Sequence, residues 1–226
     1  MKSLCLPYRN PEDLFIMRKP LIYTIGHSTH PIGYFTEMLE AFSVNCLIDV
    51  RSIAASTYNP QYNKKPLTAS LKEHGITYLH FAEEFGARHQ QPELLDENGK
   101  VDFNKVRQSV AFQKGVERLR QGIEKGFIIA LMCSEADPLD CHRFSMVSTA
   151  LAKDGFEVNH ILKDKTFKTQ AALEAQLLKK YAKKIPKPDI FAPVVSLAEQ
   201  LSVAYKLRNK EIGYVAAVRE PGEQYD

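Results

Sequence analysis

Two cysteines, a histidine and an arginine lie close together in one short stretch of this sequence. Cys133 follows the apolar run FIIALM, and Cys141, His142 and Arg143 come after seven intervening residues. A thiol near an imidazole can act as a nucleophile or redox group, because histidine can accept its proton. A position in the first turn of a helix, which we expect for Cys141, also favours the thiolate. Glu135 adds a group for proton transfer. We therefore predict catalytic roles for Cys133, Glu135, Cys141, His142 and Arg143.

Other interpretations of these residues remain open. Carboxylates such as Glu135 and Asp140 oppose thiolate formation. In the structural alternative, Cys133 fills space in the core and Asp140 caps a helix. A metal site is a further alternative, because cysteine and histidine are ligands for zinc. Structural zinc sites favour cysteine spacings of two to four residues, however, so the spacing here predicts no bound metal.

Further polar residues follow two other apolar runs. His27 and Ser28 come after LIYTI, whereas Arg51 comes after CLIDV and Asn59 lies later in the same loop. An arginine at such a position can bind a phosphate or carboxylate through paired hydrogen bonds. A structural ion pair of Arg51 with Asp49 or Glu135 explains it equally well. We predict that His27, Ser28, Arg51 and Asn59 bind substrate, with a nucleotide or nucleic acid as the candidate partner.

These residues require a scaffold that brings loop ends together. Five apolar runs predict strands, and helical patterns separate them, so we expect an α/β fold. It would contain a five-stranded, mainly parallel sheet with helices on both faces, Rossmann-like or rhodanese-like. Ligands bind at the carboxyl ends of such strands. The predicted strands cover 21–25, 46–50, 76–80, 127–132 and 156–161, and the predicted helices cover 31–42, 66–75, 106–123 and 138–153.

The composition changes after the fifth predicted strand. Residues 162–187 contain eight lysines, and an apolar stripe indicates a basic helix that ends before Pro186. A last helix is predicted at about 194–208. We therefore expect an N-terminal extension over 1–20, an α/β core domain over 21–165 and a helical, Lys-rich C-terminal extension over 166–226.

The overall composition excludes several classes of protein. A net charge of +3 is too small to indicate nucleic-acid binding by itself, and no apolar run approaches the length of a membrane span. The first residues lack the apolar core of a signal peptide. We therefore expect a cytoplasmic protein without a membrane partner or a disulfide framework, in which Cys46 is a core residue. The sequence indicates neither a cofactor nor an oligomeric state.

Several strings of residues together resemble a known family. The chain closely resembles the domain of unknown function 488 family over about residues 21–181. The strings that carry the resemblance are YTIGHST, LIDVRS, NPQYN, LMCSEADPLDCHR and FEVNHIL. The resemblance implies a compact α/β domain and supplies no established reaction. Many relatives look richer in proline and arginine after DVRS, where this chain has residues 53–57 as IAAST. The matching motif positions are Cys133, Glu135, Cys141, His142 and Arg143 in the hallmark loop, and His27, Ser28, Asp49, Arg51, Asn59 and Pro60 elsewhere.

A looser similarity connects the chain with rhodaneses. The chain resembles the rhodanese pattern in three features: the string LIDVRS, a later strand that ends in cysteine, and a helix that carries an arginine. In rhodaneses, the cysteine at the end of the strand accepts sulfur. Cys133 occupies the matching position. The loop here lacks glycine and contains three carboxylates, which would repel thiosulfate. The resemblance therefore implies a related topology without sulfurtransferase activity.

The residues and the resemblance together favour an intracellular enzyme that acts on an anionic, nucleotide-like or nucleic-acid-like substrate. Two alternatives remain. One is a non-catalytic module that binds nucleic acid or a nucleotide through the Lys-rich helix, although lysines on a solvated helix face are common. The other is a thiol-dependent or metal-dependent redox or sulfur-transfer protein.

Overall fold

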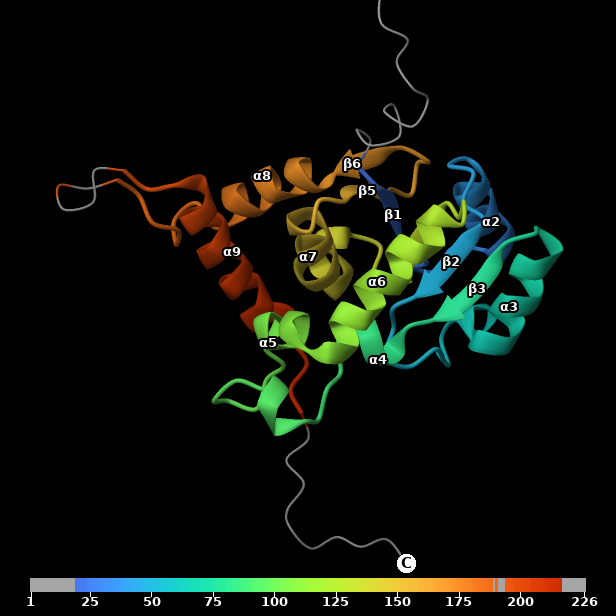
Figure 1. Ribbon diagram of the computed structural model, residues 1–226, viewed down its shortest axis with the longest axis horizontal. Coiled ribbons are helices and arrows are strands. Elements are labelled where there is room, and N and C mark those ends of the chain that lie inside the picture. Colours follow the sequence, from blue (N-terminus) through green and yellow to red (C-terminus); the bar gives the residue numbers. More distant parts are fainter. Residues whose placement is uncertain (1–18, 189, 191–193, 217–226) are drawn as a thin grey trace, which may run out of the picture.

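A central sheet covered by helices forms the core of the chain (Figure 1). The computed structural model describes residues 19–188, 190 and 194–216. Most of the predicted N-terminal extension, with Cys5, therefore lies outside the described residues. The described strands are β1 (Leu21–Gly26), β2 (Cys46–Asp49), β3 (Thr77–His80), β4 (Ile129–Cys133), β5 (Glu157–Ile161) and β6 (Phe167–Thr169).

The order of the strands in the sheet is β3-β2-β4-β1-β5-β6. The first five strands in the chain pair in parallel, as predicted from their apolar runs, and β4 lies between β1 and β2. The sequence analysis did not anticipate β6, which pairs antiparallel with β5 and lies within the segment assigned to the C-terminal extension. Its three residues are exposed or half-buried, so no apolar run marks it. Cys133 is the last residue of the central strand β4, as expected.

Helices cover both faces of the sheet. Side chains of α2 and α3 pack on one face, and side chains of α4, α5, α6 and α7 pack on the other. A third apolar cluster joins α8 and α9 to Phe144. The helices are α2 (Ile32–Glu40), α3 (Lys64–Glu73), α4 (Ala82–Phe85), α5 (Phe103–Gln108), α6 (Val110–Glu124), α7 (Thr149–Lys153), α8 (Gln170–Lys180) and α9 (Leu197–Ile212).

Two predicted helices are divided in the structure. The helix predicted over 106–123 is two helices, because Ser109 is extended and caps α6 by accepting a hydrogen bond from the Phe112 backbone. The helix predicted over 138–153 is a 3₁₀ turn (Pro138–Asp140), a π-helical segment (Arg143–Ser148) and α7. The prediction that Cys141 lies in the first helical turn is therefore wrong. Cys141 is extended, with φ −126° and ψ 144°, and helical geometry begins at His142.

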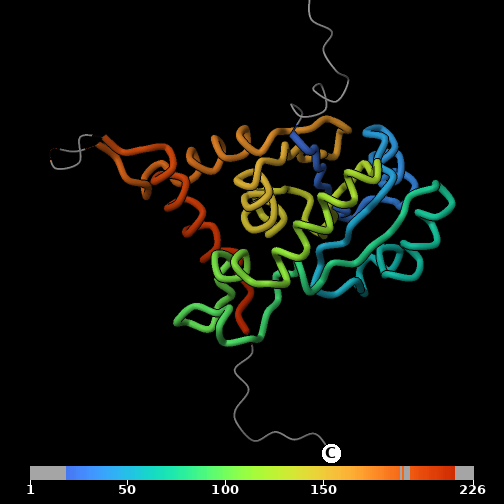
Figure 2. Tube along the Cα trace, in the orientation of Figure 1, coloured from blue at the N-terminus to red at the C-terminus, as the bar shows by residue number. Residues whose placement is uncertain are grey.

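The long polar stretch between β3 and α5 is held by the residues that follow α9. Val101 N donates to Tyr214 O at 2.9 Å, and Ala216 N donates to Gly99 O at 2.9 Å. Residues just after α9 therefore form a bridge with this stretch, and the two segments run close together in the tube trace (Figure 2). Among the described residues, no helix combines the length and apolarity that crossing a membrane requires.

Candidate functional site

Three loops meet at the carboxyl edge of the sheet, because the neighbouring strands β1, β4 and β2 all end there. The pairing of β1 with β4 continues into the loops: His27 N donates to Cys133 O at 2.9 Å and Ser28 N donates to Ser134 O at 2.9 Å. On the other side, Val50 N donates to Met132 O at 2.9 Å. The backbone thus fixes the loops on both sides of Cys133, which is 3% exposed.

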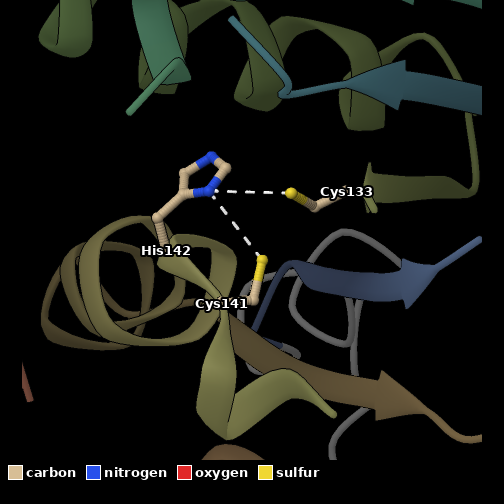
Figure 3. A group of neighbouring side chains, drawn as sticks. All are labelled: Cys133, Cys141 and His142. Carbon is tan, nitrogen blue, oxygen red and sulfur yellow. Dashed lines mark hydrogen bonds between the residues drawn. The ribbon is translucent and has the colours of Figure 1, made fainter. Parts of the chain in front are cut away.

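Cys133, Cys141 and His142 form a compact cluster at this edge (Figure 3). The Nδ1 atom of His142 lies 3.6 Å from Cys133 Sγ and 3.8 Å from Cys141 Sγ. The other ring nitrogen, Nε2, lies 3.0 Å from the carbonyl oxygen of Val50. A carbonyl only accepts hydrogen bonds, so Nε2 carries a proton and Nδ1 is the ring nitrogen that faces both sulfur atoms. Burial opposes protonation of the ring, but the interactions with Cys133, Glu135 and the Val50 carbonyl outweigh it and raise the pKa of His142 above its usual value.

The two cysteines have opposite electrostatic environments. Burial disfavours the Cys133 thiolate, but three neighbours favour it more strongly: a hydrogen bond from Cys141, and the nearby His142 and Arg143. Together they hold the pKa of Cys133 well below its usual value. Burial and the interaction with Cys133 raise the pKa of Cys141 well above its usual value. Only one thiol of the pair therefore ionises readily, and it is Cys133.

Glu135 lies beside the cluster rather than inside it. The Cys133 thiol donates to Glu135 Oε2 over 3.0 Å, and Ser134 Oγ donates to the other carboxylate oxygen over 3.1 Å. The Glu135 residue itself is exposed. A carboxylate in this position can exchange protons both with the thiol and with solvent.

Arg143 holds the loop that carries Glu135. Its side chain is fully buried, and its two terminal nitrogens donate to Glu135 O at 2.6 Å and Ala136 O at 3.1 Å. Its backbone N–H donates to Cys141 Sγ at 3.4 Å. The guanidinium is thus bonded to the protein backbone. Arg143 therefore lies next to the cluster, and its contacts shape the loop; a catalytic role for it remains a prediction.

Arg51 is also engaged by the protein. Its Nε and one terminal nitrogen donate to the two carboxylate oxygens of Asp49 at 2.9 and 2.6 Å, and the same terminal nitrogen donates to Tyr62 O at 2.7 Å. Its other terminal nitrogen lies 3.2 Å from His27 Nε2. Burial, with a contribution from the Arg51 charge, lowers the pKa of His27 to about 4. His27 is therefore neutral, and the structure contains the Arg51–Asp49 ion pair that was the alternative to anion binding.

A cavity of about 740 Å³ opens above the cluster. Cys133, Glu135 and His142 line it, whereas Cys141 lies behind them. The four predicted substrate-binding residues also line the same cavity, so the structure brings the predicted groups of three loops together. These four residues are His27, Ser28, Arg51 and Asn59.

Arg88 and Tyr214 are among the cavity residues that were not predicted from the sequence. Arg88 is exposed at the cavity, and its guanidinium lies 5.6 Å from the centre of the Tyr214 ring. No carboxylate of the described residues forms an ion pair with Arg88. Arg88 comes from the polar stretch after β3 and Tyr214 from the chain after α9, and neither follows a strand directly. The only sequence signal was the unusual length of that polar stretch.

The comparisons with known proteins identify the family. The family model described as "Domain of unknown function DUF488" matches residues 31–150, which is 120 of 226 residues and just over half of the chain. The matched segment contains Arg51, Cys133, Glu135 and Cys141–Arg143. A search of curated proteins found no match. The chain belongs to the DUF488 family of α/β proteins.

Proposed function

We propose that this protein is an enzyme whose reaction centre is the cluster of Cys133, Cys141 and His142, and that its substrate carries an anionic group. The observation that carries the proposal is the convergence of two sulfur atoms on Nδ1 of His142, beside the polar cavity. The hydrogen bond to Val50 fixes the orientation of the imidazole ring, a feature typical of catalytic histidines. Glu135 would exchange protons with the bound substrate or solvent.

Arg88 is the group that we assign to the anionic part of the substrate. Arg51 and Arg143 already donate to acceptors of the protein, so their guanidinium groups serve to position the loops. Arg88 lines the cavity, and within the described part of the chain its exposed guanidinium donates no hydrogen bond, so its donors are available for an anion. A phosphate or carboxylate bound there would lie at the mouth of the cavity, above the cluster.

The test is an activity screen with chromogenic phosphate monoesters, phosphate diesters and neutral carboxylate esters. Wild type should turn over an anionic compound, and His142→Asn should lower kcat at least 100-fold, the usual effect of losing a proton-transfer group. Arg88→Ala should raise KM about fivefold for the anionic compound and leave the neutral ester unaffected, because about 1 kcal/mol of binding is lost.

The matched control is Cys46→Ala, which removes a buried cysteine of β2 that belongs to the apolar core. It should keep wild-type kcat, whereas Cys133→Ser should lose it. Activity that survives both Cys133→Ser and His142→Asn would contradict the proposed reaction centre.

A second candidate function is thiol redox chemistry. The sulfur atoms of Cys133 and Cys141 lie within 4.8 Å of each other, and a modest side-chain movement would bring them to bonding distance. Two-electron oxidation of the pair would release two protons to an acceptor disulfide, which would be reduced to two thiols. Intramolecular disulfide formation on treatment with oxidised glutathione, detected by loss of two alkylatable thiols, would favour this function.

A further inference from the structure

We infer that Cys133 Sγ, Cys141 Sγ and His142 Nδ1 are three ligands of one tetrahedral Zn²⁺ ion, whose fourth position opens to the cavity. The three atoms all lie within 4.8 Å of one another, and they come from three residues that are buried or half-buried. The sequence alone did not predict a metal, because the spacing of the cysteines is unusual for zinc.

The distances within the cluster support this assignment. Zinc–sulfur bonds of about 2.3 Å and zinc–nitrogen bonds of about 2.0–2.1 Å, at tetrahedral angles, place sulfur and nitrogen about 3.6 Å apart. The observed separations from His142 Nδ1 are 3.6 Å to Cys133 Sγ and 3.8 Å to Cys141 Sγ. An ion can therefore bind between these atoms with little side-chain movement.

The surroundings of the three atoms also suit metal ligands. His142 Nε2–H donates to Val50 O at 3.0 Å, which leaves Nδ1 as the coordinating nitrogen and fixes the ring. The backbone N–H of Arg143 donates to Cys141 Sγ at 3.4 Å, a contact that stabilises sulfur carrying negative charge. The buried Arg143 guanidinium adds positive charge nearby. Thiolate and imidazole ligands select zinc over magnesium or calcium, which prefer oxygen.

The number of ligands distinguishes this site from a structural zinc site. Structural sites use four protein ligands, whereas catalytic sites use three and leave one position for water or substrate. Cys133 and His142 line the cavity and Cys141 does not, so the free side of the cluster faces the cavity. Glu135 lies on that side, next to Cys133. The use of the metal in a reaction rests on the proposed function, but its binding does not.

The experiment measures metal binding by the full chain without any substrate. Protein purified under reducing conditions should contain about one Zn²⁺ per chain by mass spectrometry of metals. After removal of zinc by a chelator, addition of Co²⁺ should produce a thiolate-to-cobalt charge-transfer band together with the visible absorption of tetrahedral cobalt. We expect the affinity for Zn²⁺ to fall at least roughly 100-fold in each of the variants Cys133→Ser, Cys141→Ser and His142→Asn. Mutation of a residue that only hydrogen-bonds to a metal ligand already lowers metal affinity by about 10- to 100-fold.

Two control variants sharpen the result. Cys46→Ala removes a cysteine outside the cluster and should keep one Zn²⁺ per chain. Glu135→Gln should also keep it, because the three-ligand site does not include this carboxylate. Loss of zinc in Glu135→Gln would show that Glu135 is a fourth ligand and would contradict the open fourth coordination position of the zinc ion. The cobalt spectrum of the wild-type chain remains decisive if a ligand variant fails to fold.

The inference is overturned if the reduced wild-type chain binds neither Zn²⁺ nor Co²⁺, or if the ligand variants bind as tightly as wild type. A purified chain without metal, whose two thiols form a disulfide, would also overturn it in favour of the redox candidate. Catalysis by a reduced wild-type chain that binds neither Zn²⁺ nor Co²⁺ would overturn the inference and leave the proposed function intact. Stoichiometric zinc with no turnover in the activity screen would support the inference and count against the proposed function.

Discussion

At the scale of single residues, the site depends on a very close approach between two backbones. Gly26 ends β1 directly against the loop after β4. A Cβ atom at this position would lie 1.9 Å from the carbonyl oxygen of Glu135 and 3.1 Å from a terminal nitrogen of Arg143. That same carbonyl accepts the hydrogen bond by which Arg143 holds the loop. Glycine at position 26 is therefore required for the loop to lie next to the cluster.

We expect Gly26→Ala to lower the free energy of unfolding by at least about 2 kcal/mol, because either β1 or the loop must move. Gly33→Ala is the matched control, since a Cβ at Gly33 in α2 meets no atom within 4 Å. It should be neutral or stabilise the protein by up to about 1 kcal/mol. Urea unfolding of both variants checks the prediction, and equal stability of the two would contradict the close packing described here.

At the scale of elements, a buried histidine links the sheet to helix α8. His160 in β5 is completely buried, with Nε2 2.9 Å from Gln170 Oε1 and Nδ1 2.8 Å from Thr24 Oγ1. An Nε2–H that donates to Gln170 leaves Nδ1 to accept from the Thr24 hydroxyl, so the neutral ring satisfies both contacts. Burial lowers the pKa of His160 to about 3. The Gln170 contact opposes this shift in part, and the Arg143 charge adds to it.

This pKa makes stability depend on pH in a defined direction. Between about pH 6.5 and 3 the unfolded chain protonates His160 and the folded chain does not, so the unfolded state binds more protons. Stability that is present above pH 6.5 is therefore lost as the pH falls. The slope from this group approaches about 1.4 kcal/mol per pH unit.

Urea unfolding at pH 7, 6 and 5 measures this slope. The variant His160→Gln should have a shallower slope than wild type, whereas His74→Gln, at an exposed histidine, should keep the wild-type slope. An unchanged slope in His160→Gln would show that other groups cause the pH dependence.

At the scale of the whole molecule, the C-terminal helix supports the segment before Cys141. Arg208 of α9 is 4% exposed; its Nε donates to Leu139 O at 2.7 Å, and one terminal nitrogen forms an ion pair with Asp140. Farther along, Tyr214 contributes to the cavity wall. Helix α9 lies outside the segment that matches the family model, yet it contacts the loop that positions one of the two clustered cysteines.

The variant Arg208→Gln should therefore loosen this loop. We expect amide hydrogen exchange across residues 139–142 to become at least about tenfold faster, because a buried charged hydrogen bond contributes roughly 1.5–3 kcal/mol. Lys206→Gln, at an exposed position of the same helix, is the control and should not change the exchange. Exchange measured by mass spectrometry on both variants gives the answer, and equal rates in the loop would mean that α9 does not support it.

The sequence by itself determined the parallel sheet and the edge at which its loops meet. Long apolar runs predict strands buried on both faces, and parallel strands place their loops at one edge, so the convergence of the loops after β1, β2 and β4 followed from local patterns. The residues of the cavity floor, Cys133 and His142, came from the same reasoning. The short edge strand β6 did not, because an exposed strand of three residues has no apolar periodicity.

Only the tertiary structure decided how the side chains at this edge are arranged. The spacing of Cys133 and Cys141 in the sequence argued against a metal, but this spacing does not determine the direction of the backbone. Cys141 is extended and His142 starts a helical turn. The side chains of these two adjacent residues therefore point to the same place, next to Cys133. The sequence could not tell an anion-binding Arg51 from one paired with Asp49. That depends on long-range packing, which buries both groups and makes their pairing necessary.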